Sequence, residues 1–306
     1  NTIMPLVANT DLPSFVRLRS EGETILLRED AVRQDIRELH IGLLNMMPDR
    51  ALEATERQFF RLVGESNQIA QFYVHPFTLD EMERGAKAQM HIDKFYKKFE
   101  QIKEEGLDAL IITGANVIGP ELSEQAFWQP LIEVFDWAYE NVTSILCSCL
   151  ATHAVLQFRY GQHRRLLNRK RWGVYSHRVT DRTHALVTGV NTRFDVPHSR
   201  FNQVDKSQFE SAALKILVET DQEDVHLAVS EDGFRIVFFQ GHPEYDTVSL
   251  LKEYKRELGR FILKETEIYP PVPENYYSLR NKAILDEYQD HVLQGRSDAI
   301  GIPVFP

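Results

Sequence analysis

The chain has 306 residues, 43% of them hydrophobic and 26% charged, which is typical of a globular enzyme with one large core or two small ones. Its formal net charge of -10 argues against a protein that binds duplex nucleic acid, because such proteins present a basic face. Two cysteines, no long apolar run and no signal-peptide pattern favour a cytoplasmic protein without structural disulfides or membrane spans.

The first part of the chain lacks a regular pattern, and we predict an N-terminal arm over residues 1–37. From residue 38 on, short apolar runs alternate with amphipathic stretches, which predicts strands that alternate with helices. Because the runs are almost entirely apolar, we expect a parallel sheet with helices on both faces. Strands are predicted at 39–45, 69–77, 109–114 and 144–148, and helices at 53–62, 92–104, 124–140 and 149–160.

The second half of the chain is richer in strand patterns, which could add antiparallel strands at one edge of the sheet. A predicted helix at 246–264 closes an α/β domain that spans 38–266, and the C-terminal extension 267–306 holds a last predicted helix at 279–294. The fold class is therefore α/β with a mostly parallel sheet. The additional strands are predicted at 174–179, 185–190, 216–220, 225–230 and 235–240.

Cys149 follows a predicted strand and begins a predicted helix. At such a turn the positive end of the helix favours the thiolate, and backbone N–H groups face a developing oxyanion. The small neighbours Ser148 and Ala151 suit a tight turn, so Cys149 is a candidate nucleophile. A buried structural cysteine fits the local pattern equally well. Cys147 and Cys149 could also form part of a metal site, but further ligands are scattered, and we predict no metal.

His242 and Glu244 follow another apolar strand, in the string Gly-His-Pro-Glu. This order places the imidazole at the same edge of the sheet as Cys149, where it can take a thiol proton. Glu244 can hold the imidazole tautomer and favour the imidazolium. The alternative is a surface histidine in a loop.

Two further features carry polar groups. Residues 196–201, Val-Pro-His-Ser-Arg-Phe, are typical of a binding loop or of a plain turn with a solvated arginine. Glu253 and Arg256 lie three residues apart on the helix after Glu244, which places them on one face. Their spacing favours a helix ion pair, although they could also grip the ammonium and carboxylate groups of an amino acid.

Several motifs together resemble the homoserine O-acyltransferases, which transfer succinyl or acetyl groups and share the class I glutamine-amidotransferase-like fold. The resemblance runs from roughly residue 36 to residue 260. It is carried by Asn-Met-Met-Pro at 45–48, Thr-Glu-Arg-Gln-Phe at 55–59, Thr-Gly-Ala at 113–115, Phe-Trp at 127–128, the stretch 143–149, Gly-Val-Tyr at 173–175, Pro-His-Ser-Arg at 197–200 and Gly-His-Pro-Glu-Tyr-Asp at 241–246.

The resemblance implies a ping-pong acyl transfer from acyl-CoA to the hydroxyl of an amino acid, without a further cofactor. Cys149 would carry the acyl group, with His242 as base and Glu244 as the third member of the triad. Substrate contacts would come from Lys170, Ser199, Glu253 and Arg256. The oxyanion would be bound by the amide of Leu150 and the backbone near Pro48. A homodimer is expected, with no nucleic-acid or membrane partner.

The sequence departs from the family on the acyl side of this site. Leu150 replaces a usual tryptophan, and Asp49 and Arg50 replace two lysines, one of which aids the oxyanion. At the position of Ile118 the family has glutamate with acetyl transfer and glycine with succinyl transfer. A bulky apolar residue there should crowd a succinyl carboxylate, which favours an acetyl donor. The acceptor is left open between homoserine and serine.

Two other functions remain possible on the same fold. A glutamine amidotransferase or related hydrolase would use the same cysteine, histidine and glutamate, but Cys147 stands where such enzymes have glycine. A binding or regulatory protein without activity would explain the altered oxyanion residues.

Overall fold

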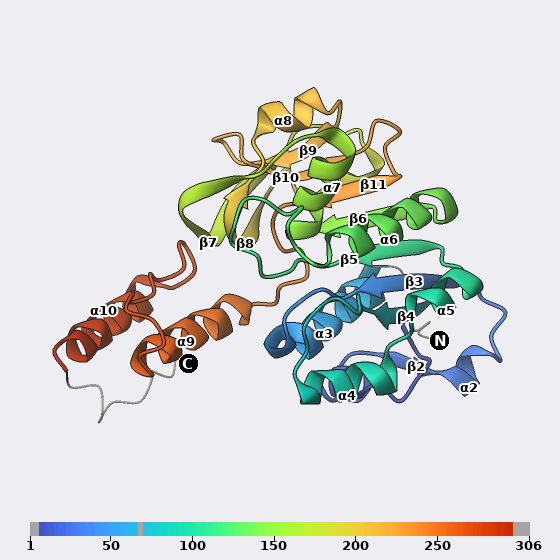
Figure 1. Ribbon diagram of the computed structural model, residues 1–306, viewed down its shortest axis with the longest axis horizontal. Coiled ribbons are helices and arrows are strands. Elements are labelled where there is room, and N and C mark those ends of the chain that lie inside the picture. Colours follow the sequence, from blue (N-terminus) through green and yellow to red (C-terminus); the bar gives the residue numbers. More distant parts are fainter. Residues whose placement is uncertain (1–5, 67–69, 296–306) are drawn as a thin grey trace.

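The computed structural model describes residues 6–66 and 70–295, in which eleven strands form one sheet (Figure 1). Their order is β2-β1-β4-β3-β5-β6-β11-β10-β9-β7-β8. The strands are β1 (Leu6–Ala8), β2 (Ile25–Leu27), β3 (Glu38–Leu44), β4 (Gln71–Phe77), β5 (Ala109–Ile112), β6 (Ser144–Ser148), β7 (Arg165–Val179), β8 (Arg193–Gln203), β9 (Lys215–Glu219), β10 (Val225–Val229) and β11 (Ile236–Phe239).

Neighbouring strands from β2 through β11 pair in parallel, whereas β10, β9, β7 and β8 continue the sheet in antiparallel fashion. The predicted α/β class, the mostly parallel sheet and the antiparallel edge are confirmed. The helices are α1 (Pro13–Ser20), α2 (Arg28–Ala31), α3 (Asp49–Ser66), α4 (Ala86–Phe95), α5 (Phe99–Glu105), α6 (Trp128–Asn141), α7 (Leu150–Tyr160), α8 (Lys206–Ser211), α9 (Ser249–Ile262) and α10 (Leu279–Leu293).

Alternation along the strands divides the core between the two faces of the sheet. Ile112 on β5 belongs to the cluster that packs under α5, α6 and α7, while its neighbour Ile111 belongs to the cluster under α1 and α3. Each parallel strand thus buries both of its faces, which explains the nearly uninterrupted apolar runs in the sequence.

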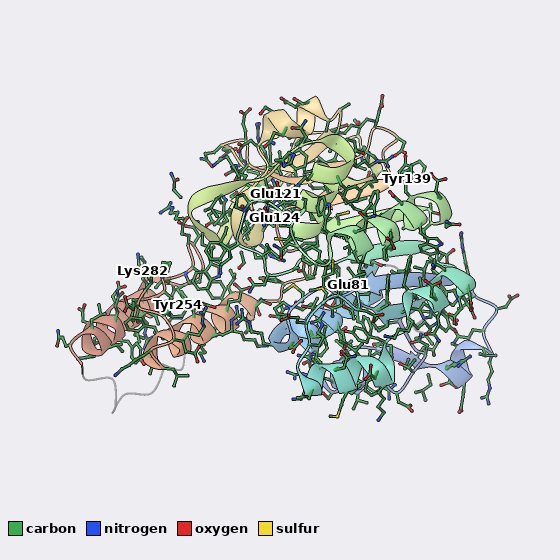
Figure 2. All side chains as sticks on the ribbon, viewed as in Figure 1. Glu81, Glu121, Glu124, Tyr139, Tyr254 and Lys282 are labelled. Atoms are coloured by element: carbon green, nitrogen blue, oxygen red, sulfur yellow. The ribbon has the colours of Figure 1, made fainter. Side chains whose placement is uncertain are left out.

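Helices α9 and α10 pack against each other and against β7, beside the main sheet (Figure 1). Tyr254 on α9, labelled in Figure 2, lies in a cluster with Trp172 of β7 and with Leu285 of α10. The segment before α10 joins β7 at Gly173, because the Val174 N–H donates to the Glu274 carbonyl at 2.9 Å. A Cβ at Gly173 would lie 2.2 Å from that carbonyl oxygen, so this junction requires glycine.

Three local predictions are wrong. In the segment predicted as an irregular arm, β1 and β2 extend the parallel edge of the sheet, with Leu6 paired to Phe72 of β4. The predicted strand at 185–190 is instead a short 3-10 turn, Ala185–Val187. The predicted helix at 92–104 is two helices, α4 and α5.

Some predictions stay untested by the structure. The domain boundaries 38–266 and 267–306 stay predictions. Parts of three predicted segments lie outside the described residues: 1–5 of the arm, 69 of the second strand and 296–306 of the C-terminal extension. None of the helices in the described ranges is both long and apolar enough to cross a membrane.

Candidate active site

Cys149 lies at a tight turn between β6 and α7. Its backbone angles, φ 51° and ψ -109°, are unusual for a residue other than glycine, and such strain persists only where neighbouring contacts hold it. Two bonds to the Phe239 carbonyl at the end of β11 do so: the Cys149 N–H and the Thr152 hydroxyl each donate to it at 2.8 Å. The half-buried thiol is therefore held at the carboxyl edge of the sheet, as predicted.

His242 reaches the same edge from β11, the parallel neighbour of β6. The backbone N–H of His242 donates to the Pro197 carbonyl of β8 at 2.9 Å, which fixes the loop after β11. The preceding Gly241 is closely surrounded: a Cβ there would lie 2.8 Å from both the His226 ring and the Val196 side chain. The glycine before the histidine is thus a packing requirement of this site.

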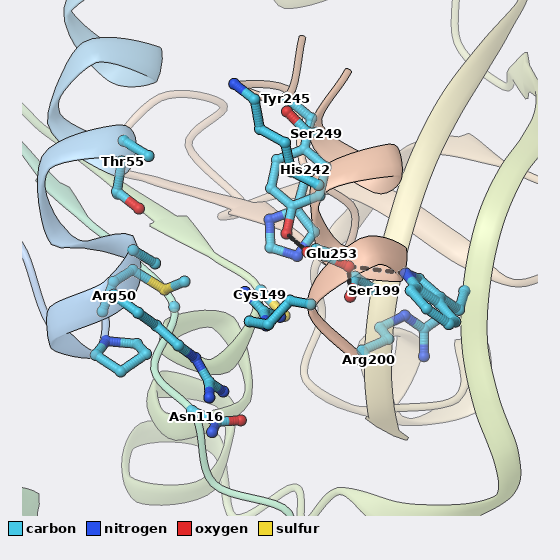
Figure 3. Close-up of a pocket in the computed structure, with 18 of the residues that line it drawn as sticks. Arg50, Thr55, Asn116, Cys149, Ser199, Arg200, His242, Tyr245, Ser249 and Glu253 are labelled. Atoms are coloured by element: carbon cyan, nitrogen blue, oxygen red, sulfur yellow. Dashed lines mark hydrogen bonds between the residues drawn. The ribbon is translucent and has the colours of Figure 1, made fainter. Parts of the chain in front are cut away.

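Cys149, His242 and Glu244 are brought together as the sequence predicted. Figure 3 shows Cys149 and His242 next to each other in the cleft. His242 Nδ1 lies 2.8 Å from Glu244 Oε1, and both side chains are buried. This contact leaves Nε2 for the thiol.

The electrostatics favour a thiolate–imidazolium pair. Burial raises the pKa of the Cys149 thiol, but the charge and hydrogen bonding of His242 outweigh burial and lower this pKa below its ordinary value. Burial likewise opposes the imidazolium, yet the Glu244 carboxylate and the Cys149 sulfur raise the pKa of His242 well above its usual range. Cys147 differs: its side chain is enclosed in the core, and burial raises its pKa.

Glu253 accepts several hydrogen bonds beside this triad. Its Oε2 accepts from Ser199 Oγ at 2.8 Å and from Trp172 Nε1 at 2.7 Å, and its Oε1 accepts from the Tyr245 hydroxyl. Burial raises the pKa of Glu253, but Lys170, whose Nζ lies 3.9 Å away, and the hydrogen bonds produce a net lowering. Glu253 is therefore held as a carboxylate.

The expected ion pair between Glu253 and Arg256 is wrong, because Arg256 Nε instead lies 3.4 Å from Oε1 of Glu257. The segment 196–201 is also neither a loop nor a turn: it belongs to β8, where Ser199 pairs with Trp172 of β7. Strand pairing places the Ser199 hydroxyl and the Trp172 indole next to the same carboxylate.

A cleft of about 620 Å³ is lined by Cys149 and by the other candidate residues except Glu244. Leu150, Pro48, Arg50 and Ile118 all line it. The Leu150 N–H is in the first turn of α7, where it has no intrahelical partner and can face an oxyanion. Pro48 itself has no N–H to offer. Ile118 is 51% exposed in this cleft and therefore accessible to a ligand, and the expectation that its side chain crowds the acyl group stays a prediction.

The sequence patterns did not reveal three residues of this cleft. Trp172 and Tyr245 hold Glu253, and Tyr245 directly follows the Gly-His-Pro-Glu string. Arg200, within the Pro-His-Ser-Arg string, is only 4% exposed and lines the cleft with Cys149. Its place in the Pro-His-Ser-Arg string is the signal that could have identified it, and its burial rules out the solvated arginine of a plain turn.

Arg200 has an incomplete set of partners. Its Nε donates to His198 at 3.3 Å and its Nη1 donates to the Asn202 carbonyl at 2.8 Å. Within residues 6–66 and 70–295, its buried Nη2 has no hydrogen-bond partner. Burial lowers the pKa of Arg200 to about 10, which still leaves it a cation. A buried, partly unpaired guanidinium beside the nucleophile is suited to an anionic group of a ligand.

Comparison with known proteins identifies the family. A family model described as homoserine O-succinyltransferase matches residues 5–292. The chain belongs to the homoserine O-succinyltransferase family. A homoserine O-succinyltransferase of Nitrosococcus oceani is 66% identical over 99% of this chain and 85% of its own length. A homoserine O-succinyltransferase of Allochromatium vinosum is 64% identical over 99% of this chain and 85% of its own length. One of Cardiobacterium hominis is 50% identical over 93% of this chain and 81% of its own length.

The predicted family and the predicted acyltransferase class are therefore confirmed. Solved structures that match include a glutamine amidotransferase from Methylobacillus flagellatus, with a TM-score of 0.47 and 11% identity over 89% of this chain and 98% of that chain. A glutamine amidotransferase from Thermotoga maritima has a TM-score of 0.45 and 14% identity over 85% and 97%. The homodimer and the cytoplasmic location stay predictions.

Proposed function

We propose that this family member transfers the succinyl group of succinyl-CoA to the hydroxyl of homoserine through a Cys149 thioester. The observation that carries the mechanism is the buried contact of His242 with Glu244 next to a thiol of lowered pKa. The acyl group and the acceptor are those named for the relatives in Nitrosococcus oceani and Allochromatium vinosum.

The first half-reaction begins from the thiolate–imidazolium pair. The Cys149 sulfur attacks the thioester carbonyl, and the Leu150 N–H at the start of α7 faces the developing oxyanion. As the tetrahedral intermediate collapses, the bond to the CoA sulfur breaks, and the His242 imidazolium gives its proton to this leaving sulfur. One thioester is replaced by another, so the step is close to thermoneutral.

The second half-reaction uses the neutral imidazole that remains. His242 takes the proton of the homoserine hydroxyl while the oxygen attacks the acyl carbonyl on Cys149. Collapse of this intermediate releases the ester and restores the thiolate beside the imidazolium. Glu244 keeps the imidazole in one tautomer throughout and stabilises its charged form.

The acceptor would lie between α9 and the triad. Glu253 is a buried carboxylate on this side of the cleft and can hold an ammonium group, while Arg256, one helical turn further along α9, can hold a carboxylate. Lys170 and Ser199, both in contact with Glu253, would complete this pocket.

Arg200 supports a succinyl donor over the acetyl donor favoured by the sequence. Acetyl has no charge for a buried guanidinium with an unpartnered Nη2, whereas the terminal carboxylate of succinyl can accept from it.

The test is CoA release from succinyl-CoA and from acetyl-CoA, each with homoserine and with serine. We expect the fastest release with succinyl-CoA and homoserine. Arg200→Met should lower kcat/KM for succinyl-CoA about tenfold more than kcat/KM for acetyl-CoA. Release of CoA over many turnovers without an amino acid, or an equal loss with both donors, would contradict the proposal.

A further inference from the structure

Two helices carry basic stripes that face the same cleft. On α3, Arg50, Arg57 and Arg61 are seven and four residues apart, and on α9, Lys252, Arg256 and Arg260 are each four apart. Such spacings place side chains on one face of a helix. All six residues line the cleft that contains Cys149. In Figure 3, Arg50 on α3 and Glu253 on α9 lie on opposite sides of Cys149.

The cleft is basic although the whole chain is acidic. Among the described residues, ten arginines and lysines line the cleft, against four aspartates and glutamates. The chain as a whole has a net charge of -10. A concentration of cations on the walls of a concave site, against the charge of the rest of the molecule, attracts and holds anionic ligands.

Three of the six cations on the two stripes lack an acidic partner. Arg61 is paired with Glu21, and Arg260 with Glu257. By contrast, no carboxylate oxygen in the described part of the chain lies within 4.0 Å of a side-chain nitrogen of Arg50, Arg57 or Lys252.

Arg50 and Arg57 also repel like charges. Burial is the main cause that lowers the pKa of Arg50, and the neighbouring Arg256 and Arg260 lower it further. The pKa of Arg57 is likewise lowered, mainly by burial and then by the charge of Arg17. An anion bound between α3 and α9 would relieve this repulsion.

We propose that these two stripes bind the phosphate groups of the coenzyme A donor, with Arg57 on α3 and Lys252 on α9 as anchors that the amino-acid acceptor does not use. This inference rests on the proposed function, which makes the donor a CoA thioester. The diphosphate and 3′-phosphate supply several negative charges at the end opposite the thioester. A homoserine carboxylate supplies one, for which Arg256 suffices.

Direct binding is the first test. The probe is desulfo-CoA, which keeps the phosphates but has no thiol, titrated calorimetrically into wild type, Arg57→Gln, Lys252→Gln and the double variant. Lys255→Gln is the control, because Lys255 has the same charge on the same helix but does not line the cleft. We expect the double variant to bind about tenfold more weakly or worse. The control should match wild type, and added salt should weaken wild-type binding. Unchanged affinity in the double variant, or no binding by wild type, would overturn the inference.

A second measurement separates this inference from the proposed function. Succinyl-pantetheine carries the same thioester as succinyl-CoA without the nucleotide phosphates. The double variant should lower kcat/KM for succinyl-CoA about tenfold and leave kcat/KM for succinyl-pantetheine unchanged. An equal loss with both donors would indicate a merely structural effect and would reject the phosphate site. If wild type uses neither donor, the proposed function fails. The desulfo-CoA titration then still shows whether Arg57 and Lys252 bind the phosphates.

Discussion

Tyr245 lies face to face with His242, with ring centroids 4.2 Å apart and planes inclined by 11°. The same tyrosine donates its hydroxyl hydrogen to Glu253. One side chain therefore packs on the candidate base and orients the carboxylate proposed to hold the acceptor's ammonium group. The geometry of the amino-acid pocket is thereby linked to the position of the imidazole.

Tyr245→Phe separates these two roles. The ring that packs on His242 is kept, whereas Glu253 loses one charge-assisted hydrogen bond, so we expect the KM for homoserine to rise about tenfold with little change in kcat. Steady-state kinetics with homoserine varied at saturating donor measure this. Tyr139→Phe, on α6 and outside the cleft, is the matched control. A fall in kcat at constant KM would show that the hydroxyl acts on the reacting atoms instead.

Glu244→Gln should slow transfer strongly without changing the shape of the site. The amide removes the charge that raises the pKa of His242, and it can stabilise the wrong tautomer, so we expect kcat to fall about 100-fold to 10 000-fold. CoA release at saturating substrates is the measurement. Glu231→Gln, which changes an exposed glutamate in the turn after β10, should retain wild-type activity. A Glu244→Gln enzyme with wild-type kcat would remove Glu244 from the mechanism.

The reactivity of Cys149 should extend to lower pH than that of an ordinary thiol. Because His242 lowers the pKa of Cys149, alkylation by iodoacetamide should follow a titration with its midpoint below 9.0. Cys147 should stay unmodified in the folded protein because its thiol is enclosed. In His242→Ala the midpoint should move upward, since burial then acts on the thiol without the compensating cation. An unshifted midpoint in that variant would contradict the ion pair.

Acid should destabilise the protein in the range where ordinary histidines titrate. Burial lowers the pKa of His153 to about 3 and that of His75 to about 4, and also lowers the pKa values of His177, His198 and His226. The unfolded chain binds protons on these side chains below its pKa of about 6.5, whereas the folded protein does not.

Stability should therefore fall as the pH falls from about 6.5 toward about 4, by up to about 1.4 kcal/mol per pH unit for each of these histidines. His91 and His242 have raised pKa values, so their contributions are fully present below about 6.5 and are lost only as the pH rises. Denaturant unfolding at a series of pH values measures the slope. A free energy of unfolding that is constant between about pH 6.5 and about pH 5 would contradict the burial of neutral histidines.

The triad could be predicted because its signals are local. The turn at Cys149 follows from an apolar strand that runs directly into a helix, and the pairing of β6 with β11 then brings His242 to the same edge. The N-terminal strands could not be predicted in this way. Each is three residues long; β1 pairs with β4, far away in sequence, and β2 pairs in turn with β1, so tertiary pairing decides their conformation.

The contacts of Glu253 also depend on tertiary structure. Helix spacing offers Arg256 as its neighbour, but donors from β7, β8 and the loop before α9 converge on the carboxylate instead. Which donors meet a helix residue depends on how the helix lies against the sheet, and no short pattern encodes that. For the same reason the sequence around Ser199 predicts a loop or a turn, because its strand is defined by register with β7.

The most direct test of the central claim is the mass of the intact protein after mixing with succinyl-CoA in the absence of an amino acid. The account predicts an increment of one succinyl group on the wild-type chain, located at Cys149 by peptide mapping and removed when homoserine is added. Cys149→Ala should show no increment, while Cys147→Ala should behave like wild type. An increment that persists in Cys149→Ala, or transfer to homoserine without any acylated protein, would contradict the account.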